Sequence, residues 1–380
     1  MGFTVGILKE TAPGESRVAM TPKVVDLFTK MGATVVAEKG AGLAAGFPDA
    51  DYQAKSVTLV DSAADVTRQA ELILTVSVPD PKVFTASNTV VGFCDPLSEP
   101  RRMAAFAESG ARLFAVELIP RITRAQSMDT LSSMASIAGY KAVLLAAAAL
   151  PRMFPMMMTA AGTIPAAKVL ILGAGVAGLQ AIATARRLGA VVMGYDVRSA
   201  VKEQIESLGA KFLTITIEGS GEGEGGYAKQ LTDAQLKSQR DQMAAALREQ
   251  DVVITTAAVP GRKAPILITK EMVSGMAPGS VIVDIAAERG GNCELTRAGE
   301  TVNANGVQII GPVNIPSSVA YHASMMYARN LAAFIKNMVN KEQKLAPDPN
   351  DEIVRDTLVA EGGKVVHSKV QALLGTVVNA

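Results

Sequence analysis

Three glycines in this chain have the spacing of a dinucleotide-binding turn. The apolar run Val169–Leu172 predicts a buried strand, and it leads directly into Gly173-x-Gly175-x-x-Gly178. In such a pattern the first glycine allows a tight turn, the second lets backbone N–H groups approach a pyrophosphate, and the third lets a helix pack on the strand. The pyrophosphate then lies at a helix N-terminus, where unpaired N–H groups favour negative charge. The alternative is a Rossmann-like unit that is kept for its fold or binds another nucleotide.

An acidic residue follows at the place where this motif needs one. A helical pattern, Leu179–Leu188, ends at Gly189, and a second predicted strand, Ala190–Tyr195, ends at Asp196. We expect Asp196 to accept hydrogen bonds from the adenosine ribose, and its charge to favour NAD(H) by repelling the 2′-phosphate of NADP(H). Arg198 is close enough to weaken that preference slightly.

A second candidate site is the polar segment 120–132. Its polar side chains are Arg121, Thr123, Arg124, Gln126, Ser127, Asp129 and Ser132. The residues after it, 131–150, predict a long apolar helix, so Ser127 or Asp129 could serve only as its N-cap. Capping needs one side chain, however, and a loop between two domains is where binding groups gather. Both interpretations remain open on the residues alone.

The elements around these sites predict two doubly wound α/β domains. In residues 1–119, short apolar runs alternate with helical patterns that begin at Thr21-Pro22 and Pro100 and end at Gly32 and Gly110. This alternation predicts parallel β-α-β units without a glycine fingerprint. The expected strands are Thr4–Leu8, Thr34–Ala37, Val57–Val60, Leu72–Val76, Thr89–Phe93 and Leu113–Val116.

The dinucleotide-binding domain is expected to continue to about residue 312. Its further expected elements are the helices Ala200–Leu208 and Asp233–Leu247 and the strands Lys211–Ile215, Val252–Thr255, Ser280–Asp284 and Val307–Ile310. The glycine-rich segment Glu218–Tyr227 is either a linker or a lid that carries Tyr227. Asp284 ends its strand at the carboxyl edge of the sheet, so it is either a ligand-binding group or a turn-forming one.

The C-terminal residues predict a return to the first domain. A second long helix is expected at Tyr321–Val339, and a hairpin pairs Thr357–Ala360 with Lys364–Val366 around two glycines. Such a tail is too short to form a domain, so we expect it to pack on residues 1–119. The expected domains are therefore 1–130 with 330–380, and 140–320, joined by the two long helices.

Composition excludes several classes of function. The formal net charge is +1 and no lysine- or arginine-rich run is present, which argues against nucleic acid as a partner. Cys94 and Cys293 are isolated, as expected in a reducing compartment, and no metal-ligand spacing appears. No apolar run reaches about 18 residues, so we do not expect the chain to span a bilayer. We interpret Met156–Met158 as core filler.

The residues do not form an acid–base or nucleophilic constellation. The two histidines, His322 and His367, lie far from the polar segment and are interpreted as structural. Near the N-terminus, Lys9-Glu10 precedes the run Pro13–Pro22, in which Arg17 is interpreted as a surface arginine paired with Glu10 or Glu15.

Several motifs together closely resemble one family, the NAD(H)-binding component of proton-translocating nicotinamide nucleotide transhydrogenase. The resemblance runs from about residue 5 to about residue 340. The motifs that carry it are Arg121-Ile-Thr-Arg-Ala-Gln-Ser-Met-Asp129-Thr-Leu-Ser-Ser133, Phe154-Pro-Met-Met-Met-Thr-Ala-Ala-Gly162, Gly173–Ala185 and Gly225-Gly-Tyr-Ala-Lys229.

The resemblance implies a mechanism and partners. NADH bound here would pass a hydride to NADP⁺ on a separate NADP(H)-binding component, and a membrane-spanning proton-channel component would couple the transfer to proton movement. Transfer between two nicotinamides moves no proton at the reacting carbons, so the protein needs to supply only proximity and orientation. The chain is expected to be a homodimeric, cytoplasmic subunit that associates peripherally with the inner membrane through its partners.

The resemblance also implies roles for individual residues. Arg121, Asp129 and Ser132 would position the nicotinamide ring and its carboxamide, Gln126 would reach the NADP(H) side, and Tyr227 would lie on a loop that closes over the nucleotide. The predicted cofactor-binding set is Gly173, Gly175, Val176, Ala177, Gly178, Asp196, Val197, Arg198, Tyr227, Thr256 and Ala257.

The main alternative is alanine dehydrogenase, which shares the Lys-Glu…Arg-Val-Ala…Thr-Pro opening. That enzyme needs a substrate-binding lysine near position 75 and a catalytic histidine near position 95, where this chain has Thr75 and Asp95. Amino-acid oxidation would then lack its carboxylate anchor and its general base, and Arg17 would be a remnant of the shared fold. A third possibility is a non-catalytic NADH sensor.

Overall fold

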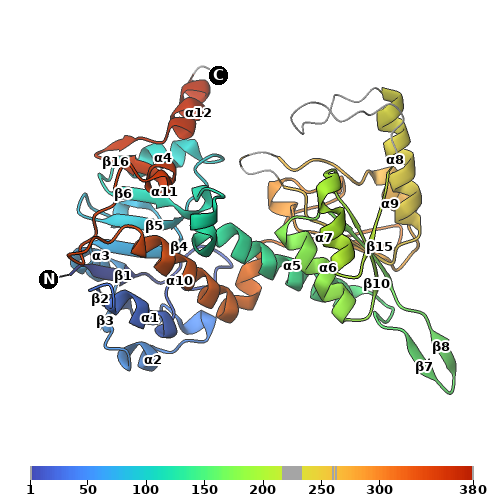
Figure 1. Cartoon of the computed structure of the whole chain (residues 1–380), viewed down its shortest axis with the longest axis horizontal. Helices are drawn as coiled ribbons and strands as arrows, with labels where there is room; N and C mark the ends of the chain where they lie inside the picture. The colour runs from blue at the N-terminus through green and yellow to red at the C-terminus, as the bar shows by residue number, and fades with distance from the viewer. Residues whose placement is uncertain (1, 216–232, 259–260, 262, 379–380) are drawn as a thin grey trace. The chain divides into compact units, whose positions relative to one another are not determined.

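The computed structural model divides the chain into two compact units. It describes residues 2–215, 233–258, 261 and 263–378. The first unit comprises Met1–Met134 and Pro316–Ala380, and the second comprises Ala135–Ile315 (Figure 1). The first unit is therefore discontinuous, and the expected fold class, two Rossmann-like α/β domains, is confirmed.

The first unit contains an eight-stranded sheet with the order β17-β16-β6-β5-β4-β1-β2-β3. Strands β1 to β6 pair in parallel. The strand bounds are β1 Thr4–Ile7, β2 Thr34–Glu38, β3 Thr58–Val60, β4 Leu72–Ser77, β5 Thr89–Phe93, β6 Arg112–Ala115, β16 Leu358–Glu361 and β17 Lys364–Val365. All six strands expected in residues 1–119 are present.

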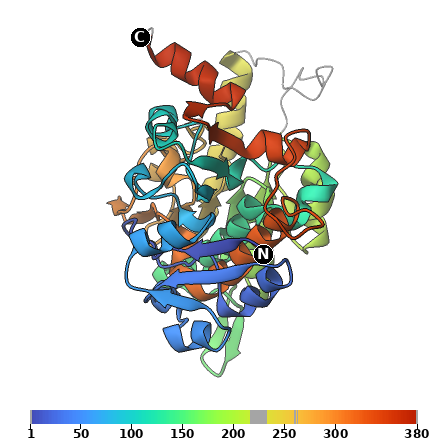
Figure 2. The ribbon, with the colours of Figure 1, turned by 90° about the vertical axis from the view of Figure 1, so that its left-hand side faces the viewer.

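The C-terminal tail completes this sheet, as expected. β16 pairs antiparallel with β6 and with β17, so the predicted hairpin adds two strands at one edge. Figures 1 and 2 both place the red helix α12 near this edge and the blue β3 at the opposite edge. The helices of the first unit are α1 Pro22–Thr29, α2 Asp49–Gln53, α3 Ala63–Gln69, α4 Pro100–Ala107, α10 Ala320–Lys336, α11 Glu352–Thr357 and α12 Ser368–Val378.

Side chains alternate between the two faces of this sheet. On β6, Leu113 and Ala115 point into a core shared with α4, whereas Phe114 faces α10 and lies edge-on to Phe334 with the ring centroids 6.1 Å apart. A strand buried on both faces needs a continuous apolar run, which is what the sequence shows.

The second unit contains a seven-stranded sheet with the order β11-β10-β9-β12-β13-β15-β14. Its strands are parallel except β14, which pairs antiparallel with β15. The bounds are β9 Lys168–Leu172, β10 Val191–Tyr195, β11 Lys211–Phe212, β12 Val252–Thr255, β13 Val281–Asp284, β14 Thr301–Ala304 and β15 Val307–Ile310, with α6 Val176–Arg187, α7 Lys202–Ser207, α8 Asp233–Arg248 and α9 Lys270–Ser274.

The two faces of the second sheet also have separate cores. Along β9, Val169 and Ile171 pack with residues of α5 and α6, whereas Leu170 and Leu172 pack with residues of α8 and α9. The alternation explains why four consecutive apolar residues precede the glycine turn. Helix α5, Thr130–Ala149, passes from the first unit into the second.

Several expectations were inexact. The helix after the glycine turn begins at Val176 rather than Leu179, strand β11 stops at Phe212, and β14 and α9 were not predicted. The larger correction concerns Met156–Met158, because the interpretation as core filler is wrong. β7 (Met157–Thr159) and β8 (Gly162–Ile164) form an exposed hairpin (Figure 1), on which Met156 is 59% and Met158 75% exposed.

One helix among the described residues meets the length and hydropathy of a membrane span. This helix is α5, and 39% of its most apolar window is buried within the protein. Core helices of soluble proteins meet the same criterion, so the finding is weak evidence for a span.

Candidate functional site

The glycine turn of the second unit has the geometry that the pattern predicts. Gly173 has a φ of +98°, a region that side chains rarely adopt, and its N–H donates to the Tyr195 carbonyl over 2.8 Å. A Cβ on Gly178 would lie 1.8 Å from the Gly173 carbonyl oxygen, so only glycine allows α6 to approach the turn this closely. Both positions therefore require glycine for structural reasons.

Gly175 has a different reason to be glycine. Its φ is −77°, which any residue adopts, and a Cβ there would meet no protein atom within 4 Å. The residue stands at the N-cap of α6, which begins at Val176. Nothing in the protein fills the space beside Gly175, so the arrangement leaves room for a group that approaches the first N–H groups of the helix.

Asp196 follows β10 beside this turn and is held in place. One carboxylate oxygen accepts from the Ala174 N–H at 2.8 Å, and the other accepts from the Arg198 N–H at 2.9 Å. The Arg198 guanidinium binds both oxygens, at 2.9 and 3.0 Å. Burial raises the pKa of Asp196, but the hydrogen bonds from Arg198 and Ala174 outweigh it and hold this pKa below its ordinary value. The carboxylate is therefore ionised and oriented.

Thr256 and Ala257 follow β12 on the other side of the turn. The Thr256 hydroxyl donates to the Gly173 carbonyl over 3.1 Å. The Ala257 N–H donates to the side-chain oxygen of Asn292, whose amide nitrogen donates back to the Ala257 carbonyl over 2.8 Å. Asn292 was not predicted; it follows Gly290-Gly291, both at positive φ, and that pair was the available signal.

Asp284 is structural, and the alternative of a ligand-binding role is not supported. Its carboxylate is fully buried. It accepts from the N–H groups of Asn292 and Cys293 and from the hydroxyls of Thr255 and Thr296, at 2.6 to 2.9 Å. A carboxylate with this many donors fixes the loop that carries Asn292.

The residues of this edge fit a dinucleotide. The open space at Gly175 suits a pyrophosphate, and the Asp196 carboxylate suits a ribose diol. Val176 and Val197 present apolar side chains that are 42% and 79% exposed, as expected of groups that a nucleotide would cover. Tyr227 and the glycine-rich segment before it lie outside the described residues.

The polar segment of the first unit forms the 3₁₀ helix η4, Thr123–Met128, directly before α5. Ala125 and Met128 are buried, while Arg121 and Gln126 are exposed. Asp129 caps α5 as the capping interpretation predicts, since one of its oxygens accepts from the Ser132 N–H over 2.8 Å. Its other oxygen accepts from the Ser132 hydroxyl over 2.5 Å. The cap thus also orients two of the candidate residues.

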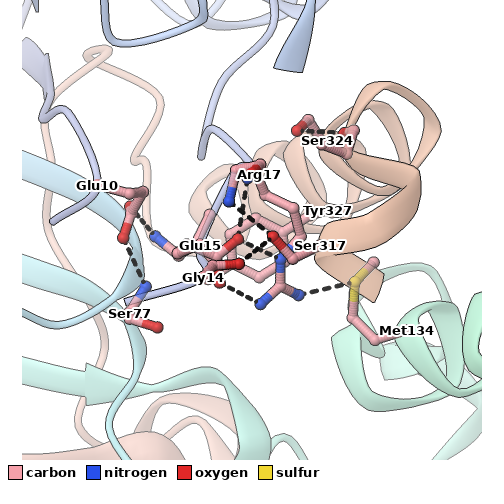
Figure 3. Close-up of polar contacts among 12 residues, drawn as sticks. Glu10, Gly14, Glu15, Arg17, Ser77, Met134, Ser317, Ser324 and Tyr327 are labelled. Carbon is pink, nitrogen blue, oxygen red and sulfur yellow. Dashed lines mark hydrogen bonds and ion pairs between the residues drawn. The ribbon is translucent and has the colours of Figure 1, made fainter. Parts of the chain in front are cut away.

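Arg17 is buried, so the interpretation as a surface arginine is wrong, although its expected partner Glu15 is correct (Figure 3). The Arg17 guanidinium donates to both Glu15 oxygens, at 2.8 and 2.6 Å, and to the Met134 sulfur at 3.2 Å. The loop is tied down by Ser317, whose hydroxyl accepts from the Ser16 N–H. A small cavity of about 260 Å³ lies beside the pair and is lined by Lys9, Glu10, Glu15, Arg17, Gly40, Ala41, Leu43 and Ala44.

Two buried glutamates terminate neighbouring strands of the first sheet. Glu10 accepts from the N–H groups of Val76 and Ser77 at the end of β4, and Glu117 accepts from those of Cys94 and Asp95 after β5. Burial raises the pKa of each carboxyl to about 7, although the backbone hydrogen bonds oppose this shift. Both groups therefore titrate near neutral pH.

The first unit does not provide the groups of the alternative, alanine dehydrogenase, at the expected positions. Thr75 lies within β4 and is 1% exposed. Its carbonyl accepts from the hydroxyl of Tyr327, whose ring stacks on Phe93 with the centroids 5.4 Å apart. Among the residues that the structure describes, no cluster of histidine, cysteine, aspartate or glutamate could hold a metal ion.

Known proteins match this chain over almost its whole length. Residues 6–138 match the N-terminal domain model of the alanine dehydrogenase/PNT family, and residues 142–368 match its C-terminal domain model. The first of the separate chains that make up the NAD(P) transhydrogenase alpha subunit of Rhodospirillum rubrum is 46% identical over 374 residues, which are 96% of this chain and 97% of that protein. An alanine dehydrogenase of Methanococcus maripaludis is 28% identical over 377 residues, 96% of this chain and 95% of that protein.

Solved structures show the same relationship. A transhydrogenase from Sinorhizobium meliloti has a TM-score of 0.84 and 44% identity, and the match covers 96% of this chain and 99% of that one. An L-alanine dehydrogenase has a similar TM-score, 0.83, but only 25% identity, over 98% of this chain and 99% of that one. The fold is thus common to both kinds of enzyme, whereas the sequence is much closer to the transhydrogenases, and this chain belongs to the NAD(P) transhydrogenase alpha-subunit members of the alanine dehydrogenase/PNT family, whose cofactor is NAD(H).

Proposed function

We propose that this chain is the NAD(H)-binding subunit of a proton-translocating, Re/Si-specific transhydrogenase. NADH bound at the glycine turn would give a hydride to NADP⁺ on a separate NADP(H)-binding component, which yields NAD⁺ and NADPH. A membrane-spanning component would couple this transfer to proton movement. The chain itself would be cytoplasmic and would associate peripherally with the inner membrane through these partners.

The observation that carries the proposal is the ionised Asp196 beside the open space at Gly175. A fixed carboxylate accepts hydrogen bonds from two ribose hydroxyls and repels a 2′-phosphate, which favours NAD(H) over NADP(H) at this site. Arg198 neutralises part of that charge, because it binds both oxygens. We therefore expect the preference for NAD(H) to be real but smaller than for an unpaired aspartate.

The polar segment supports direct hydride transfer. The nicotinamide supplies the hydride, and the reaction needs no general acid or base at the reacting carbons. Asp129 and Ser132 are oriented by their mutual hydrogen bond, and with Arg121 they would position the ring and its carboxamide. The exposed Gln126 would reach the NADP(H) side. Such residues act by orientation, which can contribute several kcal/mol to a bimolecular reaction.

We also propose that the chain is a homodimer and that the hairpin β7–β8 lies in the dimer interface. An isolated two-stranded hairpin is only marginally stable in water, and exposed methionines suit a contact surface. Met156, Met157, Met158 and Ile164 are all exposed on it. Sedimentation of wild type and of Met158→Lys should show a dimer and a shift towards monomer; a wild-type monomer would contradict the proposal.

Hydride transfer from NADPH to an oxidised NAD analogue, followed by absorbance, tests the main proposal. The chain alone should show no transfer, and addition of an NADP(H)-binding transhydrogenase component should restore it. Gln126→Ala should then slow transfer while NADH binding, measured by fluorescence titration, stays within a factor of two. Absence of transfer in the mixture, despite NADH binding, would contradict the proposed function.

The structural likeness to L-alanine dehydrogenase supports one alternative, amino-acid oxidation. The same sample should therefore be offered L-alanine with NAD⁺. We expect no NADH to form, because the position of the required lysine is the buried Thr75. NADH binding with neither activity would instead indicate a sensor.

A further inference from the structure

Two side-chain amides of α10 and the turn after it face the polar segment. Asn330 is 8% exposed, and its amide nitrogen donates to the Ser127 carbonyl over 2.8 Å. Asn337, seven residues later and so on the same side of the helix, accepts from the Arg124 guanidinium at 3.0 Å. α10 and its C-terminal residue thus hold η4 at two points.

Arg124 carries the second attachment further. The same guanidinium nitrogen donates to an Asp351 carboxylate oxygen over 2.7 Å. Asp351 in turn caps α11 by accepting from the N–H groups of Ile353 and Val354. The polar segment is therefore tied to α10 and to the start of α11, while the buried Ala125 and Met128 anchor its inner side.

Asn330 is an unfavourable choice if stability alone is considered. Its side-chain oxygen is buried and has no hydrogen-bond partner among the described residues. A leucine of similar size would fill the same place without burying an unpaired acceptor, and asparagine is a poor helix former. Local choices that cost stability are expected where a protein positions functional groups.

We propose that Asn330 and Arg124 are positioning residues for hydride transfer. They fix η4, and through it the orientation of Arg121, Gln126 and the Asp129–Ser132 pair that follows. This inference rests on the proposed function of the polar segment. A displacement of about 1 Å in groups that orient reactants can reduce a rate about 100-fold.

The decisive variant is Asn330→Leu, with Arg329→Gln as the matched control at an exposed position one residue earlier on α10. Asn330→Leu should fold with an unchanged or higher melting temperature. Hydride transfer in the presence of the NADP(H)-binding component should fall about 10- to 100-fold. The dissociation constant for NADH should change less than about threefold, because the glycine turn is untouched.

A second measurement reports on the loop itself. Hydrogen–deuterium exchange of the peptide spanning residues 120–130 should be faster in Asn330→Leu and in Arg124→Gln than in wild type and Arg329→Gln. Unchanged exchange, or faster exchange with unchanged transfer, would overturn this inference while leaving the proposed function intact. Absence of transfer by wild type with its partner would overturn both, whatever the exchange shows.

Discussion

The two sheets of this protein have the same strand order but different first loops. β3-β2-β1-β4-β5-β6 in the first unit corresponds to β11-β10-β9-β12-β13-β15 in the second. Each sheet reverses direction beside its first strand, between β1 and β4 or between β9 and β12. Open α/β sheets bind ligands in the crevice at this point, so topology alone predicts one site in each unit.

The loop that follows the first strand distinguishes the two units. In the second unit it is a glycine turn that leaves the space beside Gly175 open. In the first unit the loop is longer, and its charged side chains, Glu10, Glu15 and Arg17, occupy this edge and bind one another or the ends of β4 (Figure 3). A fold therefore offers a crevice, and the residues of one loop decide whether a cofactor can use it.

The largest expected effect comes from disrupting the charged loop of the first unit. Arg17→Met leaves the Glu15 carboxylate, whose side chain is 1% exposed, without its cation. Removal of one member of a buried ion pair costs about 3–5 kcal/mol. We expect a loss of that size in urea denaturation followed by circular dichroism. Glu15→Gln combined with Arg17→Met should recover most of it; equal stability of Arg17→Met and wild type would contradict the interpretation.

A smaller effect is expected from the titration of Glu10, whose pKa rises from 4.5 to about 7 on folding. Between these values the folded state holds a proton that the unfolded state has lost. The free energy of unfolding should therefore fall as pH rises from about 4.5 to about 7 and be level above that, by at most about 3 kcal/mol for one group.

Glu10→Gln removes this titration, so the difference between mutant and wild-type stability should change over that pH range. Denaturation from about pH 5 to about pH 8 measures it. Glu342→Gln, at an exposed position of the same unit, is the control and should parallel wild type. A slope of the opposite sign for wild type relative to Glu10→Gln would show that the carboxyl is ionised throughout.

The open turn of the second unit should respond in the opposite way, by losing function without stability. The methyl group of Gly175→Ala meets no protein atom, but it occupies the space proposed for the pyrophosphate. We expect NADH affinity to fall about 100-fold, which corresponds to about 2.7 kcal/mol, with an unchanged melting temperature. A fluorescence titration with NADH gives the affinity.

Two other glycines sharpen this test. Gly375→Ala on α12 also meets no atom and should change neither property. Gly178→Ala places its methyl group 1.8 Å from the Gly173 carbonyl oxygen and should lower both affinity and melting temperature. If Gly175→Ala bound NADH as tightly as wild type, the cofactor would lie elsewhere.

Sequence patterns predicted the second unit's site well because its requirements are local. The turn, the helix start and Asp196 lie within one β-α-β unit, where period and glycine spacing carry the information. The same holds for the parallel strands of both sheets, whose apolar runs are buried on both faces. Elements at the edges, β14 and the hairpin β7–β8, were missed because their exposed strands show neither pattern.

Contacts between residues distant in sequence could not be predicted. Arg17 was judged exposed because nothing local shows that Met134 and Ser317 enclose it. The attachment of η4 through Asn330 joins residues about 200 positions apart. Whether a polar side chain is buried depends on what packs over it, and that is decided by tertiary structure rather than by its neighbours in the chain.

The smallest effect tests whether charge at the open turn selects the cofactor. Asp196→Asn keeps a side-chain oxygen near the ribose but removes the negative charge, and it frees the Arg198 guanidinium, whose side chain is 60% exposed. We expect the dissociation constant for NADH to rise about tenfold, or about 1.4 kcal/mol, and that for NADPH to fall relative to it, since Arg198 can then pair with a 2′-phosphate. The two constants come from fluorescence titrations, with Asp241→Asn as an exposed control on α8. A ratio of the two constants that stays at its wild-type value would mean that shape, and not the charge of Asp196, excludes NADP(H) from this turn.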